Sequence, residues 1–370
     1  MTAGFTPPPY PYDRLDAFKS IASAHEGGMV DLSIGDPFDP PPAVVIEALA
    51  SSASERSYPA SIGFPAYREA AMGWMERELG VSVGAKEIAA CIGTKEFVAG
   101  LPHWLRLRTP DRDTVLYPAI SYPSYAMGAE LAGARAVPVP VTADGRSDLD
   151  AIDPADAARA LCLWVNSPGN PTGHLDDLEA AANWGRAHNV PVISDECYVE
   201  FTWDGPGRTI LEHGLDGVLA VHSLSKRSNL AGVRAGFYAG DGDLVHYLSE
   251  LRKHAGFMVP GPVQAAAVAA WNDQAHVDVQ RRVYLERLEL FRTVLAGIGV
   301  DAPMPGGAFY LWAAAPDGDS WALVERLAAE GGALVSAGEF YGPEGSDFIR
   351  VAVVQSVERL GLVGRRLGVL

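Results

Sequence analysis

The chain has 370 residues, of which 48% are hydrophobic and 20% are charged, and its formal net charge is −17. This length exceeds what one compact core usually holds, so we expect two lobes. The acidic balance argues against nucleic acid or an anionic membrane as a partner, and no apolar run is long enough to span a membrane.

The N-terminal residues and the cysteines indicate the cellular compartment of the protein. The first residues lack the basic start and apolar run of a signal peptide. Cys91, Cys162 and Cys197 lie far apart and show no C-x-x-C spacing. An odd, scattered set argues against a disulfide framework and against a zinc site. We therefore expect reduced thiols, no metal and a cytoplasmic protein.

The first elements are short. The segment TPPPYPYDRL is rich in proline, which predicts an extended arm. A helix is expected over residues 15–23. A short strand then follows in VDLSIGDPFDPPP and ends in a Gly-Asp-Pro turn, and a second helix is expected over residues 44–52.

From about residue 88 to residue 237, short apolar runs alternate with helical stretches. The runs are EIAACIG, DTVLYP, ARAVPVPV, ALCLWVN, VPVISD and GVLAVHSLS. Helices are expected between them, over residues 94–107, 124–132 and 175–188. This alternation predicts an α/β lobe with a mostly parallel sheet that helices cover on both faces.

The last third has a different pattern. A helical region is expected from Asp241 to Trp271, followed by a long charged helix over residues 275–298. The segments AFYLWAAA, GALVSAGEF and DFIRVAVV alternate with two further helices, which indicates a smaller α+β lobe. We place the large domain at residues 36–274, and the small domain at residues 1–35 together with 275–370.

The segment HSLSKRSNLAGVRAGF places Lys226 directly after an apolar strand. Ser223 and Ser225 flank it, and Arg234 follows eight positions later. Most lysines are solvated surface charges, but open α/β sheets bind ligands at the carboxyl ends of their strands. An amine beside two hydroxyls and a guanidinium suits a phosphate attached to an aldehyde.

Polar side chains follow two more of these strands. Asp195, after VPVISD, is either a helix cap or a partner for a protonated ring nitrogen, whose pKa a carboxylate would raise. Tyr198 follows in the same turn and is either exposed or a hydroxyl donor to a ligand. Asn170 lies in the tight loop VNSPGNPTG, where it could reach the same ligand.

Three further segments leave alternatives open. In CIGTKEFVAG a helix begins near Thr94, so its N–H groups could bind phosphate, although a bare turn explains the motif more simply. Tyr122 could stack on a flat ring or belong to the core. Arg350 lies inside an apolar strand and needs an anion, either a structural carboxylate or the carboxylate of a substrate.

The order of these motifs along the chain is similar to that of a known enzyme family. N-P-T-G, D-E-x-Y, S-x-S-K and the later arginine follow one another between Ile34 and Val354. In this, the sequence resembles the fold-type I, class I/II aminotransferases, which depend on pyridoxal 5′-phosphate (PLP). The resemblance implies the PLP-dependent transferase fold, with a mostly parallel seven-stranded sheet in a large α/β domain and a smaller α+β domain.

The resemblance also implies a role for each side chain. Lys226 forms the Schiff base, or internal aldimine, with PLP. Asp195 pairs with the pyridine nitrogen, and Tyr122 stacks on the ring. Asn170 and Tyr198 hold the 3′-oxygen. Lys226, Asp195 and Tyr198 are therefore the expected catalytic residues, in a ping-pong exchange between an amino acid and an oxo acid.

Other matched positions surround these. The phosphate is expected among Gly93, Thr94, Lys95, Ser223, Ser225 and Arg234. Tyr58, in SYPASIGFPAYRE, matches the tyrosine that reaches the phosphate of the other subunit, so the resemblance implies a homodimer. Gly35, Asn170 and Arg350 match positions that receive the substrate α-carboxylate.

The substrate is suggested by HSLSKRSNLAGVRAGF, LRKHAGFMVPGPVQAA, GGAFYLW and GEFYGP. These resemble the actinobacterial-type succinyldiaminopimelate transaminases, which implies transfer between N-succinyl-LL-2,6-diaminopimelate and 2-oxoglutarate in lysine biosynthesis. An aminotransferase for aspartate or an aromatic amino acid stays open, as does a PLP lyase or decarboxylase. A ligand-sensing module is disfavoured, because no helix-turn-helix precedes the arm.

Overall fold

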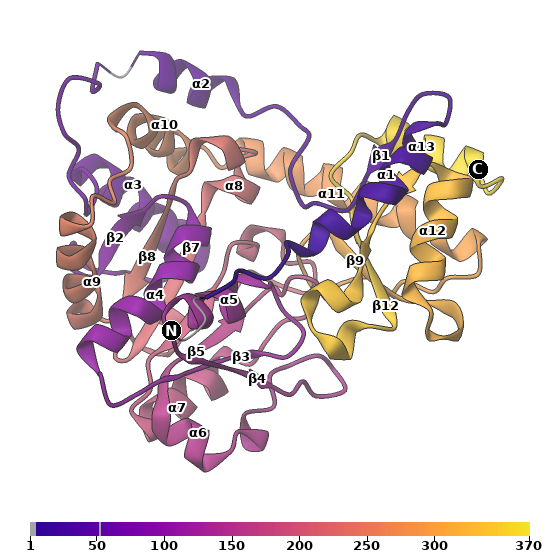
Figure 1. The fold of residues 1–370 in the computed structure, drawn as a ribbon. Coiled ribbons are helices and arrows are strands. Elements are labelled where there is room, and N and C mark those ends of the chain that lie inside the picture. Colours follow the sequence, from indigo (N-terminus) through magenta and orange to yellow (C-terminus); the bar gives the residue numbers. More distant parts are fainter. Residues whose placement is uncertain (1–4, 52) are drawn as a thin grey trace.

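The computed structural model describes residues 5–51 and 53–370 and shows two lobes, with one long helix leading from the larger to the smaller (Figure 1). The larger lobe holds a seven-stranded sheet in the order β2-β8-β7-β6-β5-β3-β4. Of the seven strands, β8 alone runs in the opposite direction to the others, so the expected mostly parallel sheet is confirmed. The strands are β2 (Ile88–Cys91), β3 (Thr114–Pro118), β4 (Arg135–Val139), β5 (Ala160–Asn166), β6 (Val192–Asp195), β7 (Val218–Ser223) and β8 (Gly236–Gly240).

Helices cover both faces of this sheet. Successive side chains of a strand point to opposite faces, so in β7 Val218 and Ala220 join one apolar cluster while Leu219 and Val221 join the other. Burial on both faces explains why these strands appear as continuous apolar runs. The first cluster is covered by α2 (Ala43–Ala50), α3 (Pro65–Trp74), α7 (Leu178–His188) and α10 (Gly261–Asn272), and the second by α4 (Thr94–Arg108), α5 (Ser124–Leu131) and α9 (Gly242–His254). The remaining helices of the larger lobe are α6 (Pro154–Arg159) and α8 (Leu224–Arg227).

The smaller lobe combines both ends of the chain. Its antiparallel sheet has the order β11-β12-β9, and a second, parallel pair joins β1 to β10. One apolar cluster contains Leu15 and Leu32 together with Phe291, Leu327 and Val351. The expected α+β lobe is therefore present, while its limits at residues 35 and 275 stay a prediction. Its elements are α1 (Asp16–Ser23), β1 (Val30–Asp31), α11 (Ala275–Gly297), β9 (Tyr310–Ala314), α12 (Ser320–Gly331), β10 (Ala333–Leu334), β11 (Ser336–Ala337), β12 (Phe348–Ala352) and α13 (Val357–Arg366).

Local expectations needed correction at three places. The arm is not extended to its end: residues Pro11–Leu15 form a 3-10 helix, because proline suits the first helical position, and Tyr12 and Leu15 are buried. Helix α7 begins at Leu178 rather than at residue 175, because the Asp177 side chain caps it. The region after Asp241 contains two helices, α9 and α10. The predicted end of α2 at Ser52 lies outside the described residues.

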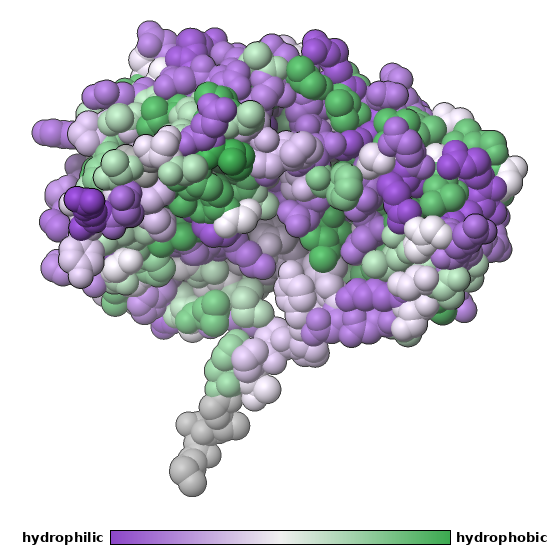
Figure 2. Space-filling model, turned by 90° about the horizontal axis from the view of Figure 1, so that it is seen from above, coloured by the Kyte–Doolittle hydropathy of each residue, from purple (hydrophilic) through white to green (hydrophobic). Residues whose placement is uncertain are grey.

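Among residues 5–51 and 53–370, no helix is long and apolar enough to cross a membrane. On the face shown in Figure 2, hydrophobic residues lie in several separate patches among hydrophilic ones.

Candidate active site

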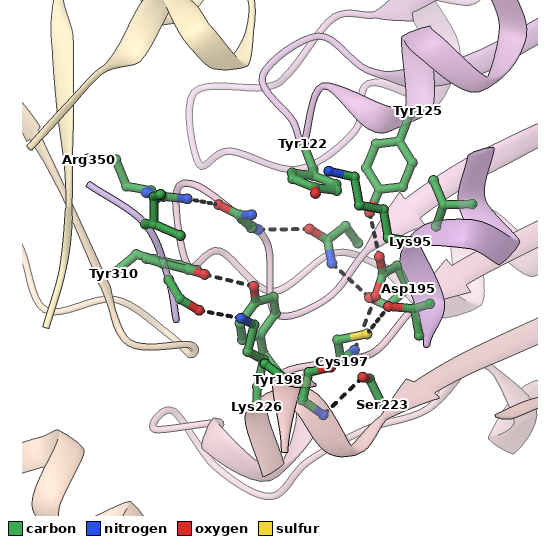
Figure 3. A pocket seen from close by; sticks show the side chains of 18 of the residues that line it. Lys95, Tyr122, Tyr125, Asp195, Cys197, Tyr198, Ser223, Lys226, Tyr310 and Arg350 are labelled. Carbon is green, nitrogen blue, oxygen red and sulfur yellow. Dashed lines mark hydrogen bonds between the residues drawn. The ribbon is translucent and has the colours of Figure 1, made fainter. Parts of the chain in front are cut away.

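A cavity of about 210 Å³ lies where the central strands end, between the two lobes. The segments after β3, β6 and β7 contribute Tyr122, Tyr198 and Lys226 to its wall, and β12 of the smaller lobe contributes Arg350 (Figure 3). The loop after β5 contributes Asn170. This is the edge at which α/β sheets bind ligands. The predicted residues that line the cavity are Gly35, Thr94, Lys95, Tyr122, Asn170, Asp195, Tyr198, Ser223, Ser225, Lys226, Arg234 and Arg350.

Two predicted residues lie outside the lining. Gly93 adjoins the cavity through Arg234, whose guanidinium occupies the space that a Cβ at position 93 would need. A side chain there would displace the guanidinium, so glycine is required. Tyr58 is 96% exposed and does not line the cavity of the single chain. Its action across a subunit interface stays a prediction.

Lys226 projects from the single turn of α8. Ser223 begins that turn, and its hydroxyl accepts a hydrogen bond of 3.1 Å from the Ser225 N–H. The amine of Lys226 donates to the Gly35 carbonyl. Burial disfavours the ammonium form and lowers the pKa of Lys226 to about 8, although the nearby Asp36 charge opposes this shift. A neutral amine near physiological pH can act as a nucleophile or as a base.

We expect Lys226 of the PLP-free protein to react with an acylating reagent in a pH-dependent way. Only the neutral amine is nucleophilic, so labelling should rise with pH around a midpoint of about 8 rather than the ordinary 10.5. Competitive acetylation read by peptide mass spectrometry would measure this, with free N-α-acetyl-lysine as the standard. A midpoint at the standard's value would contradict the lowered pKa.

Asp195 ends β6 and is buried beside the cavity. Its Oδ2 accepts a hydrogen bond of 2.9 Å from the Tyr125 hydroxyl, and its Oδ1 accepts one of 3.3 Å from the Cys197 N–H. No lysine, arginine or histidine of the described chain forms an ion pair with it. Burial raises the pKa of this carboxyl, which the two donors partly offset. A cationic ring nitrogen from a ligand would supply the missing partner.

A cradle for a phosphate lies near the start of α4. Arg234 lines it, and its Nη1 is 2.8 Å from the Ala231 carbonyl and 3.4 Å from the Ser225 hydroxyl, while no described carboxylate pairs with it. The backbone of Arg234 is left-handed, with φ +58°, a conformation that non-glycine residues rarely adopt outside functional sites. An unneutralised guanidinium, serine hydroxyls and a helix N-terminus suit a dianion.

Arg350 is 2% exposed and forms no salt bridge within the described chain. Its Nη1 donates to Asn170 Oδ1 at 3.0 Å, its Nη2 donates to the Ser33 carbonyl, and its Nε has no partner among the described residues. The guanidinium carbon lies 4.5 Å from the centre of the Tyr310 ring and 4.9 Å from that of Tyr341. The structural salt bridge considered from the sequence is absent, so the fork suits an incoming carboxylate.

The cavity also contains residues that sequence reasoning missed: Tyr10, Tyr12, Ile34, Val98, Tyr125, Asn166, Cys197, Ala231 and Tyr310. Tyr125 had a usable signal, because it lies in the first turn of the helix that follows Tyr122, next to the strand end at which the other site residues gather. The Tyr310 hydroxyl is 2.8 Å from that of Tyr198, a pairing of residues from different lobes that no local pattern indicates.

The donor set fits one cofactor. A buried amine, a buried carboxylate without a cation among the described residues and an anion cradle lie around one cavity, and these groups would suit the aldehyde, the ring nitrogen and the phosphate of PLP. The sheet and these strand ends define a PLP-dependent enzyme of fold type I.

Comparison with known proteins narrows the class. The model of the family "Aminotransferase class I and II" matches residues 27–363, and the chain belongs to that family. It is 41% identical over 368 residues to the 4-dedimethylamino-4-oxo-anhydrotetracycline transaminase OxyQ of Streptomyces rimosus, covering 97% of this chain and 99% of that one. It is 34% identical to the LL-diaminopimelate aminotransferase of Desulforudis audaxviator, covering 97% and 96%.

A solved structure agrees with these relatives. The "probable N-succinyldiaminopimelate aminotransferase" from Thermus thermophilus superposes with a TM-score of 0.87 at 31% identity, over 96% of this chain and 98% of that one. The protein is therefore a PLP-dependent aminotransferase, as the sequence motifs predicted. The substrates named for these relatives differ from one another.

Proposed function

We propose that this aminotransferase exchanges the amino group between N-succinyl-LL-2,6-diaminopimelate and 2-oxoglutarate. The observation that carries the proposal is that the cavity holds, besides Lys226 and the Arg234 of the phosphate cradle, two further cations without carboxylate partners among the described residues. Arg350 lies at its buried end, and Lys95 lies at its exposed mouth. The Lys95 amine is 5.5 Å from the ring centre of Tyr10 and 5.7 Å from that of Tyr122. Two such cations suit a substrate with carboxylates at both ends.

The expected contact of Lys95 with the phosphate stays a prediction. Its side chain lies over two tyrosine rings, so only its backbone N–H, in the first turn of α4, remains a candidate for the phosphate. An ammonium at the open mouth leaves room for a long substrate. Two relatives whose names include diaminopimelate support the same choice.

PLP, when bound, accepts the electrons released at the substrate Cα. The chain's own residues do the remaining work in this proposal. Arg350 holds the α-carboxylate and thereby orients the Cα–H bond. The Lys226 amine then removes the proton from Cα. Asp195 keeps the ring nitrogen protonated, and Tyr198, whose hydroxyl is fixed by Tyr310, donates to the 3′-oxygen.

We expect a single half-reaction to identify the donor. The PLP-loaded protein is mixed with N-succinyl-LL-2,6-diaminopimelate, glutamate, aspartate, phenylalanine or alanine, and both the cofactor absorbance and the oxo-acid product are measured. The succinyl compound and glutamate should each give one equivalent of oxo acid. Replacing Lys95 by methionine should raise KM for these two donors about tenfold and leave that of alanine unchanged.

Other outcomes have definite meanings. Conversion by aspartate or phenylalanine alone would discard the diaminopimelate substrate and keep the transaminase. Because the chain is 41% identical to OxyQ, an oxo-anhydrotetracycline is the second candidate substrate. It is tested as the amino acceptor, after the enzyme has first taken the amino group from glutamate. Release of ammonia while the cofactor absorbance stays unconverted would indicate a lyase.

We also propose a cytoplasmic homodimer in which Tyr58 reaches the phosphate bound to the partner subunit. Tyr58 is 96% exposed, and Phe38, Val44 and Ile46 of the same N-terminal region are 44–61% exposed. Apolar side chains exposed together favour an interface. Replacing Tyr58 by alanine should weaken PLP binding about tenfold and leave the mass measured by light scattering at that of a dimer. A fully active monomer would exclude the proposal.

A further inference from the structure

Arg227 follows Lys226 and is only 2% exposed. Each of its three nitrogens has a partner. Nε donates to Glu200 Oε1 at 2.9 Å, Nη1 donates to the Ala270 carbonyl at 2.7 Å, and Nη2 donates to Gln274 Oε1 at 2.8 Å. A buried guanidinium with this many directed bonds has one available position. The turn that carries Lys226 is therefore held by its next residue.

Glu200 connects this arginine to the other side of the site. It lies two residues after Tyr198, in the 3-10 helix Val199–Phe201. Its Oε1 also accepts a bond of 2.6 Å from the Trp74 indole N–H, and its Oε2 accepts one of 3.1 Å from Gln274 Nε2. The carboxylate thus joins the turn of Tyr198 to the turn of Lys226.

Gln274 is the third member and lies directly before α11, the long helix that leads into the smaller lobe (Figure 1). Its side chain does not cap that helix but binds Arg227 and Glu200 instead. Further along α11, Arg281 donates to the carbonyls of Glu200 and Thr202, the latter at 3.0 Å. The start of α11 is therefore attached to the same network.

The network lies at the seam between the two hydrophobic cores. Tyr198 and Phe201 pack in the core of the smaller lobe, while Val199 packs with Trp271 under the large sheet. Neighbouring side chains of the segment that carries Glu200 thus pack in different cores. A change in the direction of α11 would therefore move this segment.

We propose that Arg227, Glu200 and Gln274 are positioning residues that set the distance between Lys226, in the larger lobe, and Arg350, in the smaller one. This rests on the proposed roles of Lys226 as base and Arg350 as carboxylate site. A substrate held by Arg350 meets the Lys226 amine only if the lobes have one relative orientation. A buried ion pair contributes little net stability, so its effect lies in fixing that arrangement.

The test is Gln274→Ala, which keeps the Arg227–Glu200 pair and removes the side-chain link from this pair to the start of α11, while the bonds of Arg281 to the backbone of Glu200 and Thr202 remain. KM for glutamate and the Kd for 2-methylglutamate, which has no Cα proton to lose, should both rise about tenfold. The cofactor absorbance should stay at its wild-type value, and Tm should fall by a few degrees at most, because Arg227 loses one partner but keeps its bonds to Glu200 and Ala270. Gln355→Ala is the matched control, because it removes a bond to the Asp31 carbonyl within the smaller lobe and should change neither constant.

A double-mutant cycle with Arg350→Lys decides the mechanism. If the network acts through Arg350, Gln274→Ala should add little to the loss already caused by Arg350→Lys, and Arg227→Lys should behave in the same way. Additive losses, or an equal loss with 4-aminobutyrate, which has no α-carboxylate, would overturn the inference. Failure of the wild-type protein to turn over any amino acid would instead overturn the proposed function.

Discussion

Replacing Lys226 by alanine is expected to abolish transamination, with kcat falling by at least about 10³-fold for every donor. The physical reason is that one amine supplies two functions. In the proposed mechanism its nucleophilic nitrogen would hold the aldehyde of the cofactor, and as a neutral base it would take the proton from the substrate Cα. No other lysine faces the inner part of the cavity among the described residues, because Lys95 lies at the mouth.

The measurement is the rate of oxo-acid formation together with the visible absorbance of the reconstituted protein, which should lose the band of a lysine-bound aldehyde. Lys86→Ala is the control, since Lys86 is exposed and lies outside the cavity. Tm of the variant should not fall. Burying the Lys226 amine costs free energy, and its removal leaves no buried charge without a partner. Turnover at the wild-type rate would make the whole assignment wrong.

The large sheet could be predicted from the sequence because its signal is local. Parallel strands buried on both faces appear as unbroken apolar runs, and their ends place polar residues such as Asp195 and Lys226 at one edge. The antiparallel direction of β8 had no such signal. The direction of a strand depends on the path of the chain between strands and not on the residues of the strand.

The parts of the site that were missed depend on contacts distant in sequence. Tyr310 meets Tyr198 across 112 positions, and Glu200 reaches Arg227 across 27 positions and Gln274 across 74. Spacing along the chain carries no information about such pairs. The arm shows the same limit: proline content predicted an extended segment, whereas the buried hydroxyls of Tyr12 and Tyr341, 2.8 Å apart, hold it against the smaller lobe.

Replacing Arg350 by lysine is expected to lower kcat/KM for glutamate by about 10²-fold or more, in line with about 3 kcal/mol for a buried, hydrogen-bonded charge pair. Lysine keeps the positive charge but loses the planar fork that binds a carboxylate through two parallel bonds. It also loses the bond of 3.0 Å to Asn170, so that side chain no longer fixes the cation.

Comparison of two amines separates carboxylate binding from a purely structural role. Glutamate carries the α-carboxylate and 4-aminobutyrate does not, so the variant should lose activity toward glutamate while its slow reaction with 4-aminobutyrate stays unchanged. The cofactor absorbance should also be unchanged, because Arg350 lies on β12 and the phosphate cradle lies at the start of α4. Equal losses with both amines, together with a lower Tm, would show that Arg350 serves the packing of the lobes and that the α-carboxylate binds elsewhere.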